Sequence, residues 1–406
     1  MQRQDLLDAY ARTRDRTERL AWPLSPEDQG LQAFPDASPI RWHRAHTTWF
    51  FETFVLGPRG VEAHEPAWGV LFNSYYEAVG PRHARPERGL LSRPSTTEVG
   101  AWRQVVDERM TELLSTLDED ALAAVTPLVL LGLAHEQQHQ ELMLTDIVAA
   151  FARHPLAPVM LDLPDLPPVE PPGEGWIEHA GGQVRVGHEG PGFAFDNEGP
   201  AHDTWLAPFA LQRRLVTVGE WAAFARDGGY ATPSLWLSDG IARVRSEGWE
   251  APAYTRLEGE SVVVFGPHGE REASPDEPAL HLSFYEADAL ATWLGGRLPT
   301  EVEWEVAFAG ATDEPWRDER LIPAQSASPF GTAWQWTRSA YEPYPGYRPA
   351  AGAVGEYNGK FMVDQQVLRG SSVFTPPGHS RPTYRNFWPA RTRFQATGLR
   401  LARDLR

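Results

Sequence analysis

The sequence predicts a protein of two domains, a helix bundle followed by a mixed α+β domain that is rich in loops. Three observations lead to this fold class. The chain has 406 residues, which is too many for one small core. Helical periodicity dominates residues 1–153, whereas short strand-like runs between turn residues follow in residues 176–406. The many prolines and the missing helical period of residues 154–175 predict a linker between the domains.

The composition limits the partners and the chemistry. Lys plus Arg number 37 and Asp plus Glu 55, and a net charge of −18 makes the chain a poor general binder of nucleic acid or anionic membrane. There is no cysteine, which excludes disulfides, thiolate ligands and a cysteine nucleophile, and fits a cytoplasmic setting. The charged N-terminus has no apolar signal core, and the longest apolar run, residues 121–134, is too short to span a bilayer.

Periodicity in the first domain predicts four helices. They cover residues 3–22, 39–56, 97–117 and 127–151, and the stretch 57–96 is expected to be loop. Ser38 is a good N-cap for the second helix, with Pro39 as its first residue. Four such helices can form a bundle that holds a metal ion between facing helices.

The fourth helix carries a candidate metal site. His135 and His139 stand four residues apart, so they share one face of the helix and can hold one ion. Leucine-rich turns on both sides predict that the helix is buried, where histidines without a partner would be costly to desolvate. Glu141 lies roughly 160° from His139 around the helix, so it points away from such an ion. A third ligand should therefore come from another helix.

The second helix offers that ligand. Trp42, Trp49 and Phe50 recur at helical spacing on one apolar face, and His46 stands in the middle of that face. A lone buried histidine is often a core residue with a nearby hydrogen-bond partner. The pair on the fourth helix needs a partner from a different helix, which favours His46 as the third ligand. His43, about 60° round the same helix, is the alternate candidate.

The loop stretch and the second domain carry weaker signals. Arginines 82, 85 and 88 follow two adjacent tyrosines, Tyr75 and Tyr76. Arginines that converge from a loop can clamp a carboxylate or can form a solvated surface, and the spacing leaves both open. Paired tyrosines are more often packing than chemistry. In the second domain we expect strands at 183–186 and 261–265, helices near 218–226 and 283–294, and no phosphate-binding glycine loop.

Six stretches in both domains match, in order, those of one known family. They are Trp42–Glu52, Leu71–Glu77, His135–Glu141, Gly296–Glu301, Gly355–Lys360 and Thr383–Phe387. Over nearly its whole length the chain resembles the hercynine sulfoxide synthases of ergothioneine biosynthesis. The resemblance implies a DinB-like four-helix bundle followed by a C-type-lectin-like domain similar to the formylglycine-generating enzymes. It also implies iron(II), Fe²⁺, held by His46, His135 and His139.

The resemblance further implies the reaction and its small-molecule substrates. The family couples a thiol to the imidazole of trimethylhistidine (hercynine), uses dioxygen, and leaves a sulfoxide. By resemblance, Gln138, Asn386 and Phe387 contact the trimethylhistidine, whose methylated cation favours aromatic surroundings. Arg85 and Arg88 resemble the clamp for the carboxylate of the thiol substrate, with Arg82 a weaker candidate.

The catalytic tyrosine and the thiol are left open. Tyr75 or Tyr76 resembles the catalytic tyrosine of one branch, whereas in the actinobacterial branch, which uses γ-glutamylcysteine, Tyr357 is the nearest match. That branch has an acidic residue where this chain has Trp388, which favours cysteine as the donor. Gln335 also stands where relatives often have glutamate, so a polar contact or ion site is expected to be missing there.

Other functions explain part of the sequence. A zinc-dependent DinB-type thiol transferase or hydrolase accounts for three histidines but not for the second domain. A binding protein with structural histidines accounts for the loop-rich half alone. Among the sulfoxide synthases, the residues do not exclude a relative that attaches sulfur at the other imidazole carbon, as in ovothiol biosynthesis, or one that uses a selenium donor.

Overall fold

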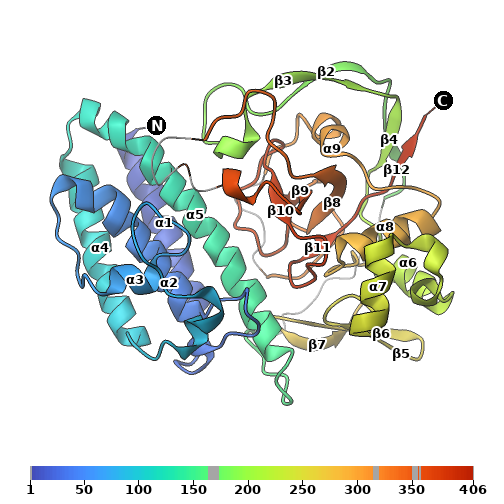
Figure 1. Ribbon diagram of the computed structural model, residues 1–406, viewed down its shortest axis with the longest axis horizontal. Helices are drawn as coiled ribbons and strands as arrows, with labels where there is room; N and C mark the ends of the chain where they lie inside the picture. Colours follow the sequence, from blue (N-terminus) through green and yellow to red (C-terminus); the bar gives the residue numbers. More distant parts are fainter. Residues whose placement is uncertain (1, 163–172, 314–319, 350–354, 356–357, 406) are drawn as a thin grey trace. The chain divides into compact units, whose positions relative to one another are not determined.

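A computed structural model describes residues 2–162, 173–313, 320–349, 355 and 358–405 (Figure 1). The chain divides into two compact units. The first holds Met1–Leu161, and the second holds Asp162–Pro349 together with Asn358–Arg406. Residues 163–172 of the predicted linker lie outside the described part, so the linker and the predicted domain limits stay a prediction.

The first unit is a bundle of long helices, of which the second and the third are joined by a long irregular stretch. The long helices are α1 (Arg3–Ala21), α2 (Ile40–Phe50), α4 (Thr96–Thr116) and α5 (Glu119–Phe151). Helix α2 continues into a π-helical turn, Phe51–Leu56, and α3 (Trp68–Phe72) lies in the stretch expected to be loop. Short 3-10 turns cover Asp28–Gly30, Gly57–Arg59 and Arg85–Leu90. Helix α5 packs against both α1 and α2, and α2 also packs against α4 (Figure 1).

The start of α5 differs from the prediction. We expected the helix to begin at Pro127, but it begins at Glu119, and Pro127 lies inside it. Asp118 caps the N-terminus, since its carboxylate accepts the backbone N–H of Ala121 at 2.8 Å. This cap, with the good helix formers that follow it, outweighs the hydrogen bond that the proline cannot donate.

Ser38 does not cap α2, so that prediction is wrong. Pro39 occupies the N-cap position and makes no side-chain cap bond. The backbone N–H of Ser38 instead donates to Asp146 Oδ2 at 2.8 Å, and its hydroxyl accepts from Arg88 Nη1 at 2.9 Å. Tertiary partners from other segments have replaced the local cap.

A buried carboxylate ties three helices of the first unit together. Glu136 on α5 is fully buried and accepts from Arg14 Nη1 at 2.8 Å and from Thr17 Oγ1 at 2.6 Å, both on α1. Arg103 on α4 also donates to it. A buried charge is tolerated where opposite charges and hydrogen bonds surround it. These bonds fix the rotation of α5 about its own axis.

This carboxylate makes the stability of the bundle sensitive to acid. Burial alone would raise the pKa of Glu136, but Arg103 and Arg14 outweigh burial and lower the pKa to about 2. Because the unfolded value is about 4.3, the unfolded chain binds more protons between these two values. We expect the free energy of unfolding, measured by urea denaturation, to fall as the pH drops from about 5 toward 2. Glu136→Gln should flatten that fall, and an equally steep fall in the variant would contradict the assignment.

The second unit consists of small sheets with four α-helices around them in its described part. The helices are α6 (Val218–Arg226), α7 (Ser238–Glu247), α8 (Phe284–Trp293) and α9 (Glu301–Ala307). The strands are β1 (Trp176–His179), β2 (Gly182–Val186), β3 (His202–Leu206), β4 (Phe209–Gln212), β5 (Thr255–Glu258), β6 (Ser261–Gly266), β7 (Gly269–Glu272), β8 (Ala333–Ala340), β9 (Gln366–Ser371), β10 (Asn386–Trp388), β11 (Thr397–Gly398) and β12 (Ala402–Asp404). The predicted strands at 183–186 and 261–265, and both predicted helices, are confirmed.

Within the described residues of the second unit, the strands pair in four sheets. Their orders are β1-β4-β12, β10-β9-β8-β11, β2-β3 and β5-β6-β7. All pairs are antiparallel except β11 with β8, which is parallel. Helix α9 packs on β9, β8, β4, β2 and β1, so it joins three of the sheets.

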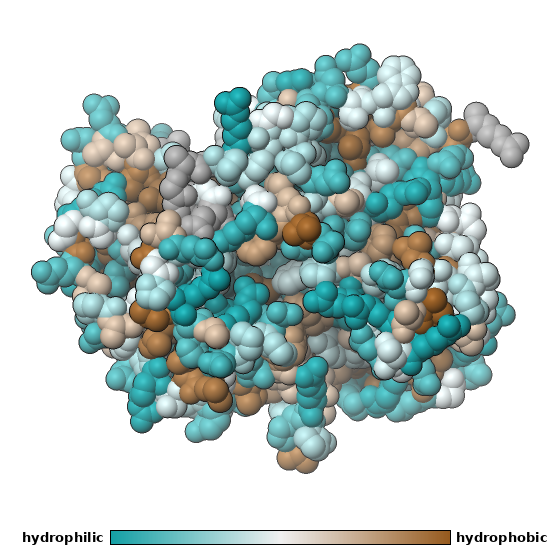
Figure 2. All heavy atoms as spheres, viewed as in Figure 1, coloured by the Kyte–Doolittle hydropathy of each residue, from teal (hydrophilic) through white to brown (hydrophobic). Residues whose placement is uncertain are grey.

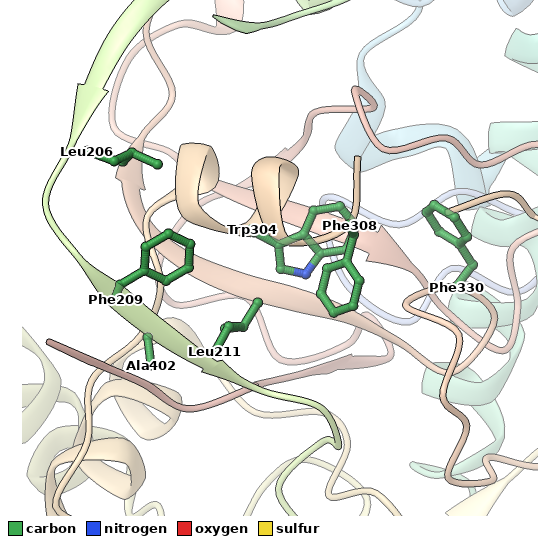
Figure 3. Close-up of a cluster of buried hydrophobic side chains, with 7 residues drawn as sticks. All are labelled: Leu206, Phe209, Leu211, Trp304, Phe308, Phe330 and Ala402. Atoms are coloured by element: carbon green, nitrogen blue, oxygen red, sulfur yellow. The ribbon is translucent and has the colours of Figure 1, made fainter. Parts of the chain in front are cut away.

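A hydrophobic cluster at α9 forms a core of this unit (Figure 3). It consists of Leu206, Phe209, Leu211, Trp304, Phe308, Phe330 and Ala402. At its edge, Trp304 Nε1–H and Arg400 Nε–H both donate to Gln335 Oε1, at 2.6 and 2.9 Å. Gln335 thus makes polar contacts, because its neutral amide oxygen accepts both bonds, and the expected loss of an ion site there stays a prediction.

None of the described helices is both long and apolar enough to cross a membrane. The face drawn in Figure 2 is largely hydrophilic, and its hydrophobic residues form small scattered patches.

Candidate metal centre

Three histidines from two helices meet inside the first unit. His46 on α2 and His135 and His139 on α5 are buried, and their candidate ligand atoms all lie within 4.8 Å of one another. His46 Nε2 is 3.2 Å from His135 Nε2. Glu141 is not part of this group among the described residues, in agreement with the helix-angle argument. The helix pairing that the sequence analysis required is present.

Burial keeps the three imidazoles neutral. It lowers the pKa of His135 to about 3 and lowers the pKa values of His46 and His139 well below their usual range. The neighbouring histidines add to the effect at His46 and His139. A neutral imidazole keeps a lone pair that a metal ion can accept, so the cluster is ready to bind without first losing protons.

Aromatic rings hold the histidines in place. Trp42 stacks on His46 at 4.6 Å between ring centroids, and Trp49 stacks on it at 5.5 Å. Phe50 packs on His135 at 4.9 Å. The apolar face predicted for α2 is thus the wall of the site, and it keeps water away from the rings. His46 Nδ1–H donates to the carbonyl of Phe72 at 2.6 Å, which leaves Nε2 for a metal.

The donor set fits a borderline metal ion. Three neutral imidazoles with no thiolate suit Fe²⁺, Zn²⁺, Cu²⁺ or Ni²⁺, whereas Mg²⁺ and Ca²⁺ prefer oxygen ligands. Three protein ligands also leave coordination positions for substrates, as catalytic metal sites require. The residues present therefore fit the iron that the resemblance implies.

His43 is not one of the clustered ligands, although it lies beside them. Its Nδ1 is 2.7 Å from Nδ1 of His139, and its Nε2 is 3.1 Å from Asp146 Oδ2. Asp146 was not among the residues expected from the sequence. It stands seven residues after His139, about 20° away around the helix, and this spacing is the signal that could have found it.

The three candidate arginines have different environments. Arg88 is buried and donates to Ser38 Oγ and Ser74 Oγ, at 2.9 and 3.0 Å, and its guanidinium carbon lies 3.4 Å over the Trp42 ring. Burial, helped by Arg85, lowers the pKa of Arg88 to about 8. Arg85 is exposed, and Arg82 is exposed and pairs with Glu77 at 3.3 Å. Of the three, Arg88 is the one that shares the aromatic wall of the histidine cluster.

The two candidate tyrosines pack together near that wall. Tyr76 is fully buried against Trp49 and Phe54, at 5.7 and 5.0 Å between ring centroids. The Tyr75 ring stacks on Tyr76 at 4.5 Å, and the two hydroxyls are 3.3 Å apart. One indole, that of Trp49, therefore touches both Tyr76 and His46.

The remaining candidates lie on α5 and in the second unit. Gln138 is half-buried beside His139. Asn386 and Phe387 belong to β10, and Asn386 Oδ1 accepts the backbone N–H of Phe387 at 2.8 Å. The Phe387 ring stacks on Tyr341 at 4.0 Å, so it is part of an aromatic surface within its own unit. Tyr357 lies outside the described residues.

Comparison with family models assigns a family to each half of the chain. Residues 9–143 match the DinB superfamily, and residues 164–328 match the sulfatase-modifying factor enzyme 1-like domain. The predicted fold class is confirmed. The protein has a helical DinB-like domain followed by a β-rich, C-type-lectin-like domain of the kind found in formylglycine-generating enzymes.

Full-length relatives join both halves. The chain is 32% identical to the hercynine oxygenase of Mycolicibacterium smegmatis, over 99% of each chain. It is also 32% identical to the hercynine oxygenase of Mycobacterium tuberculosis, over 97% of each chain. The formylglycine-generating enzyme of Thermomonospora curvata is 34% identical over 39% of this chain and 57% of its own length. The protein is therefore an enzyme, an oxygenase, and it belongs to the hercynine oxygenase family.

Proposed function

We propose that the protein is an iron(II)-dependent sulfoxide synthase of ergothioneine biosynthesis that joins the sulfur of a thiol to the imidazole of hercynine. The observation that carries this proposal is the buried cluster of His46, His135 and His139 in a chain that matches a hercynine oxygenase over 99% of both lengths. These three side chains are the proposed iron ligands. When bound, iron(II) supplies open coordination positions and the redox chemistry that dioxygen requires.

The atoms of the proposed reaction balance with one dioxygen for each product. The thiol loses the hydrogen of its S–H bond, and the imidazole loses the hydrogen of one C–H bond. A C–S bond forms, one oxygen atom becomes the sulfoxide oxygen, and the other leaves as water. The protein must hold both substrates in register and exclude water, which the apolar wall of Trp42, Trp49 and Phe50 serves.

Arg88 is the proposed partner of the thiol substrate's carboxylate. The buried guanidinium of Arg88 donates to two neutral hydroxyls, and a bond to a charged carboxylate would be stronger than either of them. Arg85, which is exposed, is proposed as a second contact. Gln138, Asn386 and Phe387 are the proposed contacts to hercynine, and the Phe387–Tyr341 stack offers the aromatic surface that a methylated cation favours.

Cysteine is the proposed thiol, ahead of γ-glutamylcysteine. Trp388, whose ring packs edge-on against Phe394 at 5.1 Å, stands where the γ-glutamylcysteine branch has an acidic residue. Iron-loaded protein should be incubated with hercynine, air and either thiol, and the products identified by mass. A cysteinyl sulfoxide as the main product supports the proposal. A γ-glutamylcysteinyl product formed faster would overturn the choice of donor but not the reaction.

A zinc-dependent DinB-type thiol transferase is the second candidate, because three neutral imidazoles suit Zn²⁺ as well as Fe²⁺. Loading the metal-free protein with either ion separates the two functions. Turnover that needs iron and air favours the sulfoxide synthase, whereas turnover with zinc and without air favours the transferase. The position of the new bond on imidazole, read by NMR, distinguishes ergothioneine-type from ovothiol-type chemistry, and a competing selenium donor tests the selenoneine-type alternative.

We expect Tyr76→Phe to slow sulfoxide formation about 100-fold, as loss of a proton donor typically does. Tyr76 is proposed to supply a proton or hydrogen atom, and its hydroxyl lies 3.3 Å from that of Tyr75. The measurement is the rate of sulfoxide formation beside the rate of thiol oxidation, since the variant is expected to divert the enzyme toward the latter. Tyr75→Phe is the matched control. If the Tyr76→Phe enzyme forms sulfoxide at the parent's rate and the Tyr75→Phe enzyme is slow, the role belongs to Tyr75.

A further inference from the structure

A line of hydrogen bonds runs away from one candidate metal ligand. Nδ1 of His139 lies 2.7 Å from Nδ1 of His43, and Nε2 of His43 lies 3.1 Å from Asp146 Oδ2. The same carboxylate oxygen accepts the backbone N–H of Ser38 at 2.8 Å. All four residues are buried, with exposed fractions of 9%, 2%, 6% and 4% for His139, His43, Asp146 and Ser38.

The donor and the acceptor of each hydrogen bond in this line can be assigned by starting from the carboxylate of Asp146. An ionised carboxylate only accepts, so His43 must donate its Nε2–H to Asp146. A neutral imidazole that donates from Nε2 accepts at Nδ1, and therefore His139 donates its Nδ1–H to His43. The lone pair of His139 is then on Nε2, the nitrogen that remains for a metal.

The two partners come from the same helices as the ligands. Asp146 follows His139 by two turns of α5, and His43 precedes His46 by almost one turn of α2. Because His43 on α2 contacts both His139 and Asp146 on α5, a rotation of either helix would break both contacts. The arrangement is thus part of the packing of α2 on α5 and does not depend on a loop.

We infer that His43 and Asp146 are positioning residues that fix the tautomer and the ring orientation of His139 as a metal ligand. The inference deepens the proposed function and rests on its metal site. A carboxylate–histidine pair behind a ligand makes that imidazole a better donor, and the loss of such outer partners typically costs about 10- to 100-fold in metal affinity. His43 is therefore neither an alternate ligand nor a core residue without a role.

The test is metal affinity in the absence of both substrates. The full-length protein is titrated without oxygen with Fe²⁺, and separately with Co²⁺, against a chelator of known affinity. His43→Phe and Asp146→Asn should each weaken binding about 10- to 100-fold. The visible absorption bands of bound Co²⁺ should also shift, which a purely structural effect on stability would not produce. His43→Gln should restore much of the affinity, because its amide oxygen can accept from His139 Nδ1–H.

Glu52→Gln is the matched control for Asp146→Asn. Glu52 is equally buried, at 5% exposure, and accepts from Trp102 Nε1 and from the backbone N–H of His64. The affinity of the Glu52→Gln variant for both ions should stay within about twofold of the parent's, because Glu52 is not an outer partner of a metal ligand. Asp146→Asn changes one atom, so it keeps the test valid if His43→Phe does not fold.

The outcomes separate this inference from the proposed function. The inference alone is overturned if the parent binds metal and the His43 and Asp146 variants bind it with the same affinity and the same cobalt spectra. Weakened variants of a parent that makes no sulfoxide support the inference and overturn the function. A parent that binds neither ion overturns both.

Discussion

Replacing His135 by alanine is expected to abolish iron binding and sulfoxide formation. The residue is one of three buried imidazoles whose candidate ligand atoms lie within 4.8 Å of one another. Two remaining imidazoles and a water-sized gap in an apolar wall are a poor site for a divalent ion, because ligand number and type set its affinity. Iron per chain, measured by elemental analysis after anaerobic loading, should fall from about one to near zero.

An exposed histidine of the same unit supplies the control. His64 is exposed and packs on Trp68 at 5.5 Å between ring centroids, so His64→Ala should keep both iron and activity. Circular dichroism of His135→Ala should show that the helices remain. A fully active His135→Ala enzyme would remove α5 from the mechanism.

Glu136→Ala should destabilise the bundle by about 3–5 kcal/mol, the largest expected effect on stability. The substitution leaves the guanidinium groups of Arg14 and Arg103, which are 4% and 2% exposed, without the buried carboxylate that both contact. Removing one partner of a buried pair costs more than the pair contributes, because the remaining charges stay desolvated. The change in the free energy of unfolding is measured by urea denaturation of metal-free protein.

Glu108 on α4 offers a comparison at an exposed site. It accepts only from Gln104 Nε2 among the hydrogen bonds described, at 3.0 Å, and Glu108→Ala should change stability by no more than about 0.5 kcal/mol. The double variant Arg103→Met with Glu136→Leu should lose less than the sum of its single changes, since Arg103 is removed together with its carboxylate partner and only Arg14 keeps a buried charge. A loss below about 1 kcal/mol in Glu136→Ala would contradict this expectation and would mean that Asp107 and Glu18, which also pair with Arg14 and Arg103, compensate the buried charges.

The sequence was most informative where a local pattern and a burial pattern agreed. His135 and His139 share a helix face by spacing alone, and the Trp42–Trp49–Phe50 face with His46 at its centre predicted which helix would meet them. The same argument removed Glu141. The spacing of residues by one helical turn is a local property, so it can be read from the sequence without knowing which other helices pack against this one.

Where long-range contacts decide, the sequence alone was insufficient. Ser38 looks like a cap but binds Asp146 and Arg88, which are distant in sequence. Pro127 looks like a helix start but lies inside α5. The helix is capped by Asp118 and begins at Glu119, eight residues before the expected start. Strands β10 and β11 have three and two residues, too short for any alternation to be seen. The roles of Arg14 and Arg103 likewise depend on contacts between helices.

Oxygen uptake by anaerobically prepared, iron(II)-loaded protein tests the central claim most directly. With hercynine and cysteine both present, we predict uptake of one dioxygen for each sulfoxide formed, and little uptake when hercynine or iron is left out. Uptake that proceeds equally without hercynine would mean that the protein only oxidises thiols. No uptake with either cysteine or γ-glutamylcysteine would contradict the sulfoxide synthase and favour the zinc transferase.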